Sequence, residues 1–170
     1  RRACAAMTAE PTIRPAAPAD ADAIWAIFHA VVAAGDTYAF DPRTPRDEAL
    51  AYWLRPDTRT WVAEVGGRIV GTYLVKPNQP GLGSHVTNAA FMVAPAARGS
   101  GVGQRMGEHC LAEARRLGYR AMQFNFVVAT NTTAVRLWQR LGFRIVGTLP
   151  GAYRRAGRGF VDAHVMFREL

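Results

Sequence analysis

The stretch FMVAPAARGSGVG, residues 91–103, decides the fold of this chain. Its first half is an apolar run closed by Pro95, which is typical of a buried strand end. Glycines at 99, 101 and 103 then stand directly before a helical pattern. A glycine turn at a helix start leaves unpaired amide N–H groups at the positive end of the helix dipole. The stretch therefore predicts a turn that binds an anion; the alternative that these residues leave open is a tight turn without a ligand.

Two common phosphate-binding motifs do not match this turn. A dinucleotide fingerprint has glycines at offsets zero, two and five, but counting from Gly99 reaches Gln104 and counting from Gly101 reaches Met106. A P-loop requires a Gly-Lys-Ser/Thr triplet, which the sequence lacks. Neither nucleotide-binding class accounts for the glycines.

The residues after the turn alternate helical and strand periods. The pattern predicts a helix over 104–118, a strand over 121–128, a helix over 131–143, and strands over 144–150 and 160–169. The first of these helices has an apolar stripe: Val102, Met106, Cys110, Ala114 and Leu117. A strand, a helix and a second strand around 85–127 should form a parallel crossover.

The residues before the turn predict a strand, two helices and three strands. These cover 12–16, 18–35, 44–54, 59–65, 68–76 and 85–95. We expect Asp20 to cap the first helix and Gly35 to end it, and Thr44 to cap the second, with Pro45 at its first position and Asp47 completing a capping box. Gly66 and Gly67 predict a tight antiparallel hairpin. The chain is thus predicted to be an α/β protein with a mixed α+β sheet of about seven strands and four helices.

Composition favours one globular domain. The chain has 170 residues, of which 49% are hydrophobic and 20% charged. We expect residues 1–10 to be a leader or remnant and 11–170 to be the domain. With Cys4 and Cys110 as its two cysteines, the sequence predicts neither a disulfide framework nor a metal site, and it favours the cytoplasm. The sequence predicts no membrane span, and the net charge of +8 favours an anionic partner, either a phosphate-bearing cofactor or nucleic acid.

The motifs together resemble the GNAT superfamily of acyl-CoA-dependent N-acetyltransferases. Arg98, Gly101 and Gly103 match the family signature Q/R-x-x-G-x-G/A. The resemblance extends to the lead-in at Val93 and Pro95. It also covers a downstream run that consists of Asn131, Ala134, Trp138, Gly142 and Phe143. It spans residues 85–149 and implies the GNAT fold, with acetyl-CoA as the acetyl donor and no metal.

This resemblance implies where coenzyme A binds. The amides of residues 98–103 would hold its pyrophosphate, the backbone near Val93 would pair with the pantetheine arm like an added strand, and Asn131 would contact the arm from the far side. The cofactor-binding residues expected on this basis are Met92, Val93, Arg98, Gly99, Ser100, Gly101, Val102, Gly103, Gln104, Asn131 and Trp138.

The sequence leaves open which groups act as the acid and the base in acetyl transfer. Trp138 stands where many family members place a tyrosine that protonates the leaving thiolate, and an indole does not ionise usefully near neutral pH. The role is vacant, filled by water, or unnecessary, because a thiolate leaves fairly well. The strand over 85–95 carries no carboxylate. Its one titratable group in a suitable range is His85, a candidate base, although we favour a water relay held by amides.

Two asparagines in apolar strands are candidate catalytic or substrate residues. Asn88 and Asn125 occupy central strand positions where asparagine is disfavoured, so each should have a partner; the alternative is that they satisfy backbone at a bulge or splay. Together with Trp138, they resemble a GNAT branch that acetylates azetidine-2-carboxylate and other proline analogues. Tyr38 and Phe40 would wall the acceptor site by the same resemblance, unless both are core aromatics.

We therefore expect an N-acetyltransferase that acts on the amine of a small molecule by direct attack in a ternary complex. A protein or peptide acetyltransferase is the first alternative, although peptide grooves are often acidic and this chain is not. An arginine-rich nucleic-acid-binding module is the second and less favoured one, because no reading motif accompanies the arginines. They are Arg115, Arg116, Arg120, Arg136, Arg140 and Arg144. A homodimer is possible by analogy with the family.

Overall fold

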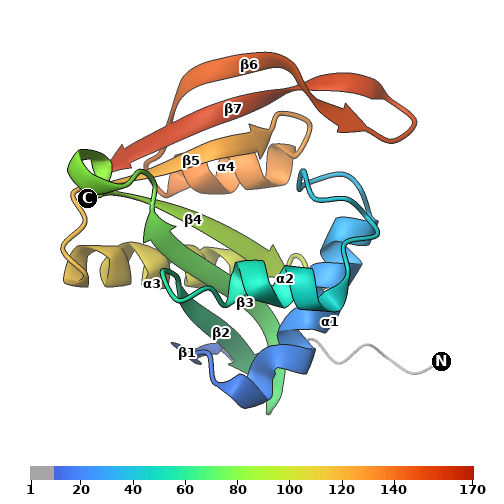
Figure 1. The fold of residues 1–170 in the computed structure, drawn as a ribbon, viewed down its shortest axis with the longest axis vertical. Helices are drawn as coiled ribbons and strands as arrows, with labels where there is room; N and C mark the ends of the chain where they lie inside the picture. The colour runs from blue at the N-terminus through green and yellow to red at the C-terminus, as the bar shows by residue number, and fades with distance from the viewer. Residues whose placement is uncertain (1–9) are drawn as a thin grey trace.

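The computed structural model describes residues 10–170, so residues 1–9 of the expected leader lie outside the described part. One seven-stranded sheet runs in the order β1-β2-β3-β4-β5-β7-β6 (Figure 1). The strands are β1 (Thr12–Pro15), β2 (Arg59–Val65), β3 (Arg68–Pro77), β4 (Val86–Val93), β5 (Ala121–Val128), β6 (Arg144–Arg155) and β7 (Gly159–Glu169). The α-helices are α1 (Ala21–Ala33), α2 (Arg46–Trp53), α3 (Val102–Arg116) and α4 (Thr132–Arg140). The predicted α/β class and mixed sheet are confirmed.

Two apolar cores lie on opposite faces of the sheet. On one face, α1 and α2 pack against side chains such as Leu74 and Met92. On the other, α3 and α4 pack against side chains that include Tyr73, Phe124 and Met122. β3 pairs antiparallel with both β2 and β4, which confirms the predicted hairpin. β4 and β5 are parallel, which confirms the predicted crossover. Four members of the expected stripe are buried on α3, whereas Leu117 follows the helix and is partly buried. The buried members are Val102, Met106, Cys110 and Ala114.

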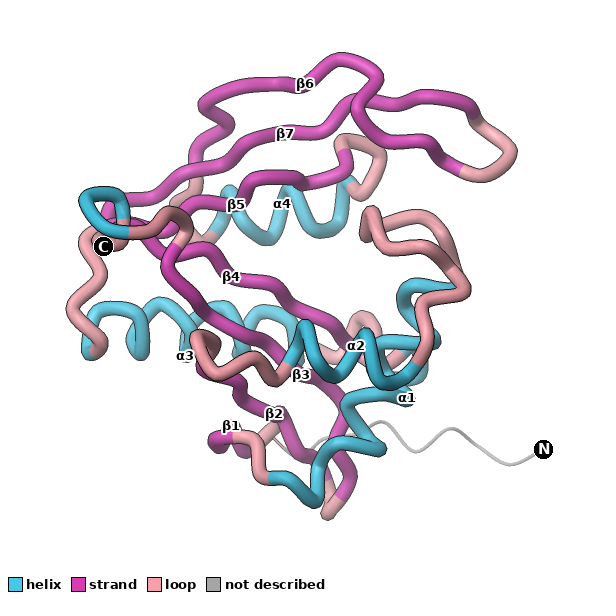
Figure 2. The backbone as a smooth tube through the Cα atoms, in the orientation of Figure 1, coloured by secondary structure: helices cyan, strands magenta, loops and turns pink. Residues whose placement is uncertain are grey.

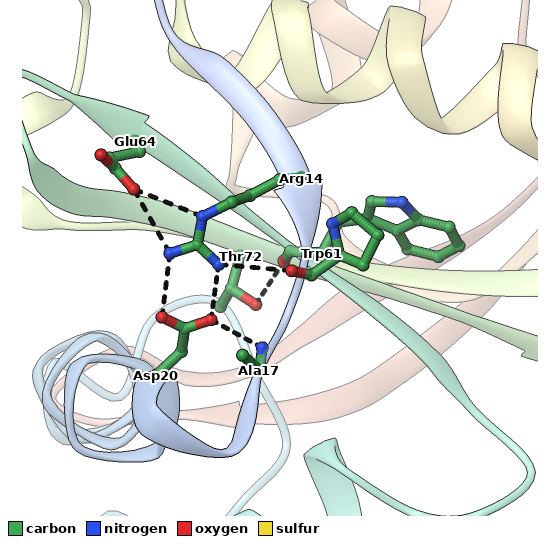
Figure 3. Close-up of polar contacts among 7 residues, drawn as sticks. Arg14, Ala17, Asp20, Trp61, Glu64 and Thr72 are labelled. Atoms are coloured by element: carbon green, nitrogen blue, oxygen red, sulfur yellow. Dashed lines mark hydrogen bonds and ion pairs between the residues drawn. The ribbon is translucent and has the colours of Figure 1, made fainter.

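The ends of α1 lie where predicted, with Gly35 in a left-handed conformation (φ of +64°) after the last turn, but no side chain caps the start of the helix. Asp20 precedes α1, but its carboxylate accepts two hydrogen bonds from Arg14 at 2.8 and 3.0 Å and one from the amide of Ala17 at 2.7 Å (Figure 3). Arg14 also contacts Glu64 of β2, so the carboxylate ties the start of α1 to the sheet. An arginine 6 residues away in the sequence competes successfully with the helix amides because a charged donor makes the stronger bond.

The second helix begins one residue later than expected. Pro45, not Thr44, is the residue before α2, and no side chain caps this end. The hydroxyl of Thr44 instead donates to the carbonyl of Asp41 at 2.6 Å, so a local turn uses the group predicted to cap the helix. Without that cap the expected capping box with Asp47 does not form.

The Arg14–Asp20 pair should make folding stability depend on pH. Hydrogen bonds from Arg14 hold the pKa of Asp20 below its usual range, so the stabilisation is complete above the unfolded pKa of about 3.9 and is lost as pH falls through the folded value. We expect Asp20→Asn to lower the free energy of unfolding at pH 7 by about 1–3 kcal/mol. Urea denaturation at pH 7 and pH 3 tests this, because the difference from wild type should shrink at the lower pH.

Asp22→Asn is the matched control for this variant. Asp22 also pairs with an arginine, Arg46, at 2.6 Å, but its side chain is 90% exposed, so its loss should change stability little. A control as destabilised as Asp20→Asn, or a difference between Asp20→Asn and wild type that persists in full at pH 3, would contradict the assignment.

The last hairpin is longer than its sequence pattern predicts. The expected strand over 144–150 continues as β6 to Arg155, because irregular pairing with β7 between Leu149 and Tyr153 lets the strand pass through Pro150 and Gly151. Among the described residues, no helix is both long and apolar enough to cross a membrane.

Candidate active site

The sheet opens between its two central parallel strands. β4 and β5 pair only at Val86–Ala121 and Thr87–Met122, and beyond these residues the strands diverge (Figure 1). The side chain of Asn88 donates from Nδ2 to the carbonyl of Gln123 at 2.9 Å, just where the ladder ends. The result is a wedge-shaped opening whose sides are the unpaired edges of two strands.

The backbone of β4 presents polar groups to this opening. Ala94 and Val86 use their backbone groups to bond toward β3, and the alternation along a strand turns those of Phe91 and Val93 the other way. The hydroxyl of Tyr38 accepts from the Phe91 N–H at 2.9 Å and donates to the Phe91 carbonyl at 2.6 Å. Within residues 10–170, no hydrogen bond is made by the N–H or the carbonyl of Val93 in that direction. Val93 therefore offers free backbone to an extended ligand.

The segment that joins α1 to α2, residues 34–45, lies across the wide end of the opening (Figure 2). Tyr38 is its innermost aromatic, and burial raises the pKa of its hydroxyl well above the ordinary value, which keeps it neutral. Tyr153 of β6 donates to the carbonyl of Tyr38 at 3.2 Å and connects the segment to the other side of the opening. Phe40 instead packs on Phe28 and Tyr52, with ring centroids 5.0 and 5.1 Å away. Tyr38 thus borders the opening, whereas Phe40 belongs to the aromatic core behind it.

The glycine turn lies at the end of β4 and leads into α3. Gly99 and Gly101 have φ of +78° and +86°, a backbone conformation that other residues rarely adopt, and a Cβ on either would meet no atom within 4 Å. In the described chain, no group accepts a hydrogen bond from the amides of residues 101–104, and no side chain caps α3. The turn is therefore an open cradle of amide donors at a helix N-terminus, with exposed Arg98 at its edge.

The other residues predicted to bind the cofactor lie around the cradle but differ in what they can offer. The hydroxyl of Ser100 donates to the Ala97 carbonyl at 2.6 Å, and Gln104 donates to Glu108 at 3.0 Å, so both side chains have protein partners. Met92 is buried in the core against α1, and Val102 is buried on the opposite face. Both can therefore contribute only backbone. A Cβ on Gly103 would lie 3.6 Å from Leu137, because α3 approaches α4 closely at this glycine.

Asn131 and Trp138 have structural roles in α4. The side-chain oxygen of Asn131 accepts from the amide of Ala134 at 3.3 Å and caps the helix. Trp138 is buried, with ring centroids 4.8 Å from Phe91 and 4.7 Å from Phe124. Its ring thus packs against aromatic side chains of both strands that border the opening.

Asn88 and Asn125 lie at the two irregularities of this region. Asn88 bonds the Gln123 carbonyl where β4 and β5 separate. Asn125 lies where the pairing of β5 with β7 shifts between Phe124 and Val127. Asn125 donates to Asn78 at 2.8 Å and accepts from Gln123 at 2.9 Å. Asn88 therefore satisfies a backbone carbonyl at an irregular point of the sheet, as the alternative for the asparagines predicted. The side chains of Asn88 and Asn125 both face the side of the sheet that carries α1 and α2.

His85 is not brought to the opening. It is exposed and precedes β4, whereas Phe91 and the free backbone of Val93 lie at the other end of that strand, about 20–25 Å away by strand rise. The geometry does not support a base at this position.

Several polar residues near the opening could not be singled out from the sequence. Lys76 of β3 is the partner of Asn88 in the ladder, and its ammonium lies 5.1 Å from the centroid of the Tyr52 ring. Asp36 and Thr37 lie in the segment before Tyr38. A single lysine or aspartate is not part of a recognisable sequence motif, so these residues could be assigned to the opening only from the fold.

An open sheet with an amide cradle beside an unpaired strand edge suits an extended ligand with an anionic head. Acetyl-CoA fits: the amides of 101–104 and Arg98 suit its pyrophosphate, and the edge at Val93 suits the amides of its pantetheine arm. Among residues 10–170, no group of three or more histidine, cysteine, aspartate or glutamate side chains could hold a metal ion.

Comparison with known proteins identifies the family. Residues 25–143 match the Acetyltransferase (GNAT) family, and the chain belongs to it. It is 33% identical to N-acetyltransferase aca1 of Schizosaccharomyces pombe over 148 residues, 77% of this chain and 71% of that protein. A GCN5-related N-acetyltransferase from Kribbella flavida is 46% identical over 95% of this chain and 98% of its own, with a TM-score of 0.91.

A second solved relative was determined with the donor bound. The acetyltransferase yncA from Salmonella typhimurium, solved with its cofactor acetyl-CoA, is 26% identical over 95% of each chain, with a TM-score of 0.85. The protein is therefore an acyltransferase of the GNAT family that uses acetyl-CoA as its acetyl donor.

Proposed function

We propose that the protein transfers the acetyl group of acetyl-CoA to the amine of a small molecule, with amino acids and imino acids as the preferred class. The observation that carries this proposal is the chemistry of the sheet face bearing α1 and α2. Asn88 and Asn125 each donate one amide hydrogen within the protein and carry a second one, and Lys76 adds an ammonium that pairs with no carboxylate within residues 10–170. Such donors suit the carboxylate of an amino or imino acid.

The chain's own groups suggest how transfer proceeds. Bound acetyl-CoA supplies a thioester carbonyl, which an uncharged amine can attack. The amides of residues 101–104 would bind the anionic head, and the Val93 backbone would orient the arm. The Phe91 N–H, once released by Tyr38, would be an oriented donor for negative charge on an oxygen. Position 138 is a tryptophan and not a tyrosine, so we propose that water donates a proton to the leaving sulfur.

A peptide acceptor is the alternative within the family. The amine of a peptide lysine or N-terminus has no carboxylate beside it for Asn88 and Lys76 to bind, and β4 and β5 themselves carry no carboxylate. Nucleic-acid binding stays the less favoured alternative, and the cytoplasmic location and the homodimer stay predictions.

The test is an acceptor screen that measures release of the coenzyme A thiol. Proline and azetidine-2-carboxylate should be acetylated faster than pyrrolidine and azetidine, which lack the carboxylate but keep the amine. Peptides with free N-termini or lysines complete the screen. Turnover of peptides alone, or equal rates with and without the carboxylate, would refute the proposed acceptor class.

Asn88 should matter for the acceptor and not for the donor. We expect Asn88→Ala to raise the KM for the best acid of the screen by about 10–100-fold, the worth of one hydrogen bond to a charged group. The Kd of acetyl-CoA, measured by calorimetry, should stay unchanged. Gln79→Ala, on an exposed neighbouring amide, is the control. An equal loss of donor affinity would mean that Asn88 supports the splay and does not bind the acceptor.

A further inference from the structure

Two buried side-chain oxygens lack a hydrogen-bond partner, and both lie in the segment between α1 and α2. They are Asp36 Oδ1 and Thr37 Oγ1, and no other buried side-chain nitrogen or oxygen in residues 10–170 shares this condition. Burying a polar atom without a partner is costly, and a carboxylate oxygen is more costly than a hydroxyl. A bound group with two hydrogen-bond donors would satisfy both atoms.

The charge of Asp36 is also unusual for this segment. Asp41, five residues further on, pairs with Arg43 at 3.3 Å and is largely exposed. Asp36 makes no salt bridge within the described residues. A cationic N–H group would supply the missing partner of Asp36, and the hydroxyl of Thr37 beside it is a second acceptor.

Contacts connect this pair with the opening between β4 and β5. Asp36 and Thr37 directly precede Tyr38 in the chain. Burial raises the pKa of Tyr153, and the charge of Asp36 adds to this effect. The hydroxyl of Tyr153 bonds the carbonyl of Tyr38, and the hydroxyl of Tyr38 bonds the Phe91 backbone. The orphan oxygens thus lie on the segment that borders the Phe91 end of the opening, on the side of the sheet opposite α3.

We propose that Asp36 Oδ1 and Thr37 Oγ1 bind the protonated amine of the acceptor, and that Asp36 takes one of its protons. The inference rests on the proposed function, because it assigns a seat for the nitrogen of that acceptor. A secondary ammonium has two N–H donors, which matches two acceptor oxygens. One N–H bond breaks, its proton goes to Asp36 Oδ1, and its electron pair stays on nitrogen as the lone pair needed for attack. The proton then passes from Asp36 to water.

The first test measures cation binding without any reaction. Pyrrolidinium chloride should raise the melting temperature of the wild-type protein by about 1–4 °C above the effect of N,N-dimethylpyrrolidinium chloride, which has no N–H. Asp36→Asn should lose this difference, and Thr37→Val should reduce it. Asp41→Asn is the matched control, because it removes a charge from the same segment and should behave as wild type.

Asp36→Asn should also fold well. It removes a half-buried carboxylate that has no salt-bridge partner among the described residues, so the melting temperature of the free protein should stay within about 2 °C of wild type while stabilisation by acetyl-CoA persists. Thr37→Val keeps the test decisive if the first variant fails to fold. The inference is overturned if pyrrolidinium gives wild type no advantage over the quaternary salt, or if Asp36→Asn retains it.

Turnover separates this inference from the proposed function. With proline, Asp36→Asn should lower kcat/KM about 100-fold at neutral pH, within the usual range for loss of a base. With methoxyamine, whose nitrogen is already unprotonated, the loss should be less than about 5-fold. Turnover of proline without any pyrrolidinium effect would overturn the inference alone. A pyrrolidinium effect without turnover of any small amine would overturn the proposed function alone.

Discussion

Gly101→Glu is expected to abolish the binding of acetyl-CoA and leave the fold intact. Gly101 has a φ of +86°, so any side chain there costs about 1–2 kcal/mol of strain, and the position itself is open. A carboxylate at the cradle would face the pyrophosphate, and two unit charges 4 Å apart repel by about 4 kcal/mol near a protein surface. The affinity measured by calorimetry should fall more than about 100-fold.

Gly118→Glu is a close control for this variant. Gly118 follows the same helix at its other end, with a φ of +85°, and a Cβ added to it would meet nothing within 4 Å. Both glutamates should therefore cost similar stability, but only the one at position 101 should weaken donor binding. Gly101→Ala separates strain from charge, and it should retain most of the affinity. If Gly118→Glu weakens binding as much as Gly101→Glu, strain and not the cradle explains the loss.

Trp53→Ala is expected to cause the largest loss of stability, about 3–5 kcal/mol. Trp53 ends α2 and is fully buried, and its indole N–H donates to the hydroxyl of Thr72 on β3 at 3.0 Å. The carbonyl of Trp53 accepts from Thr60 at 2.8 Å, so this residue attaches α2 to two strands. Its removal leaves a cavity between α2 and the sheet, where the ring also packs on Phe28. Urea denaturation followed by circular dichroism measures the effect.

Two further variants divide this loss into its parts. Trp53→Phe keeps most of the packing and loses the bond to Thr72, so it should cost about 1–2 kcal/mol. Trp25→Ala removes a half-buried tryptophan of α1 that packs mainly on Phe28 and His29, and it should cost clearly less than Trp53→Ala. Equal losses for Trp25→Ala and Trp53→Ala would show that Trp53 has no special role in anchoring α2.

The order of elements could be predicted from the sequence because local patterns encode it. The glycine pair at Gly66 and Gly67 has φ of +57° and +76°, as a tight hairpin requires. The stripe of α3 and the alternation in β5 likewise follow from burial on one face. The glycine turn at 99–103 could be assigned to an anion because helix starts lack acceptors for their own amides.

Long-range partners could not be predicted in the same way. Asp20 stands at the sequence position of a helix cap, but Arg14 competes for its carboxylate, and only the fold brings the two together. The hydroxyl of Tyr38 crosses 53 positions in sequence to reach Phe91. No local sequence pattern marks Asp36, because its distinguishing property is a buried oxygen without a hydrogen-bond partner in the fold. The acceptor side of the site therefore depends on tertiary contacts, whereas the donor side is largely local in sequence.

Hydrogen–deuterium exchange read by mass spectrometry tests the central claim most directly. The claim is that acetyl-CoA binds between the edge of β4 and the glycine turn. Adding acetyl-CoA should slow exchange in peptides that cover 91–93 and 98–104, and it should leave those covering 115–120 at the far end of α3 unchanged. Protection confined to the arginine-bearing surface of α4 and β6, or no protection at 98–104, would contradict it.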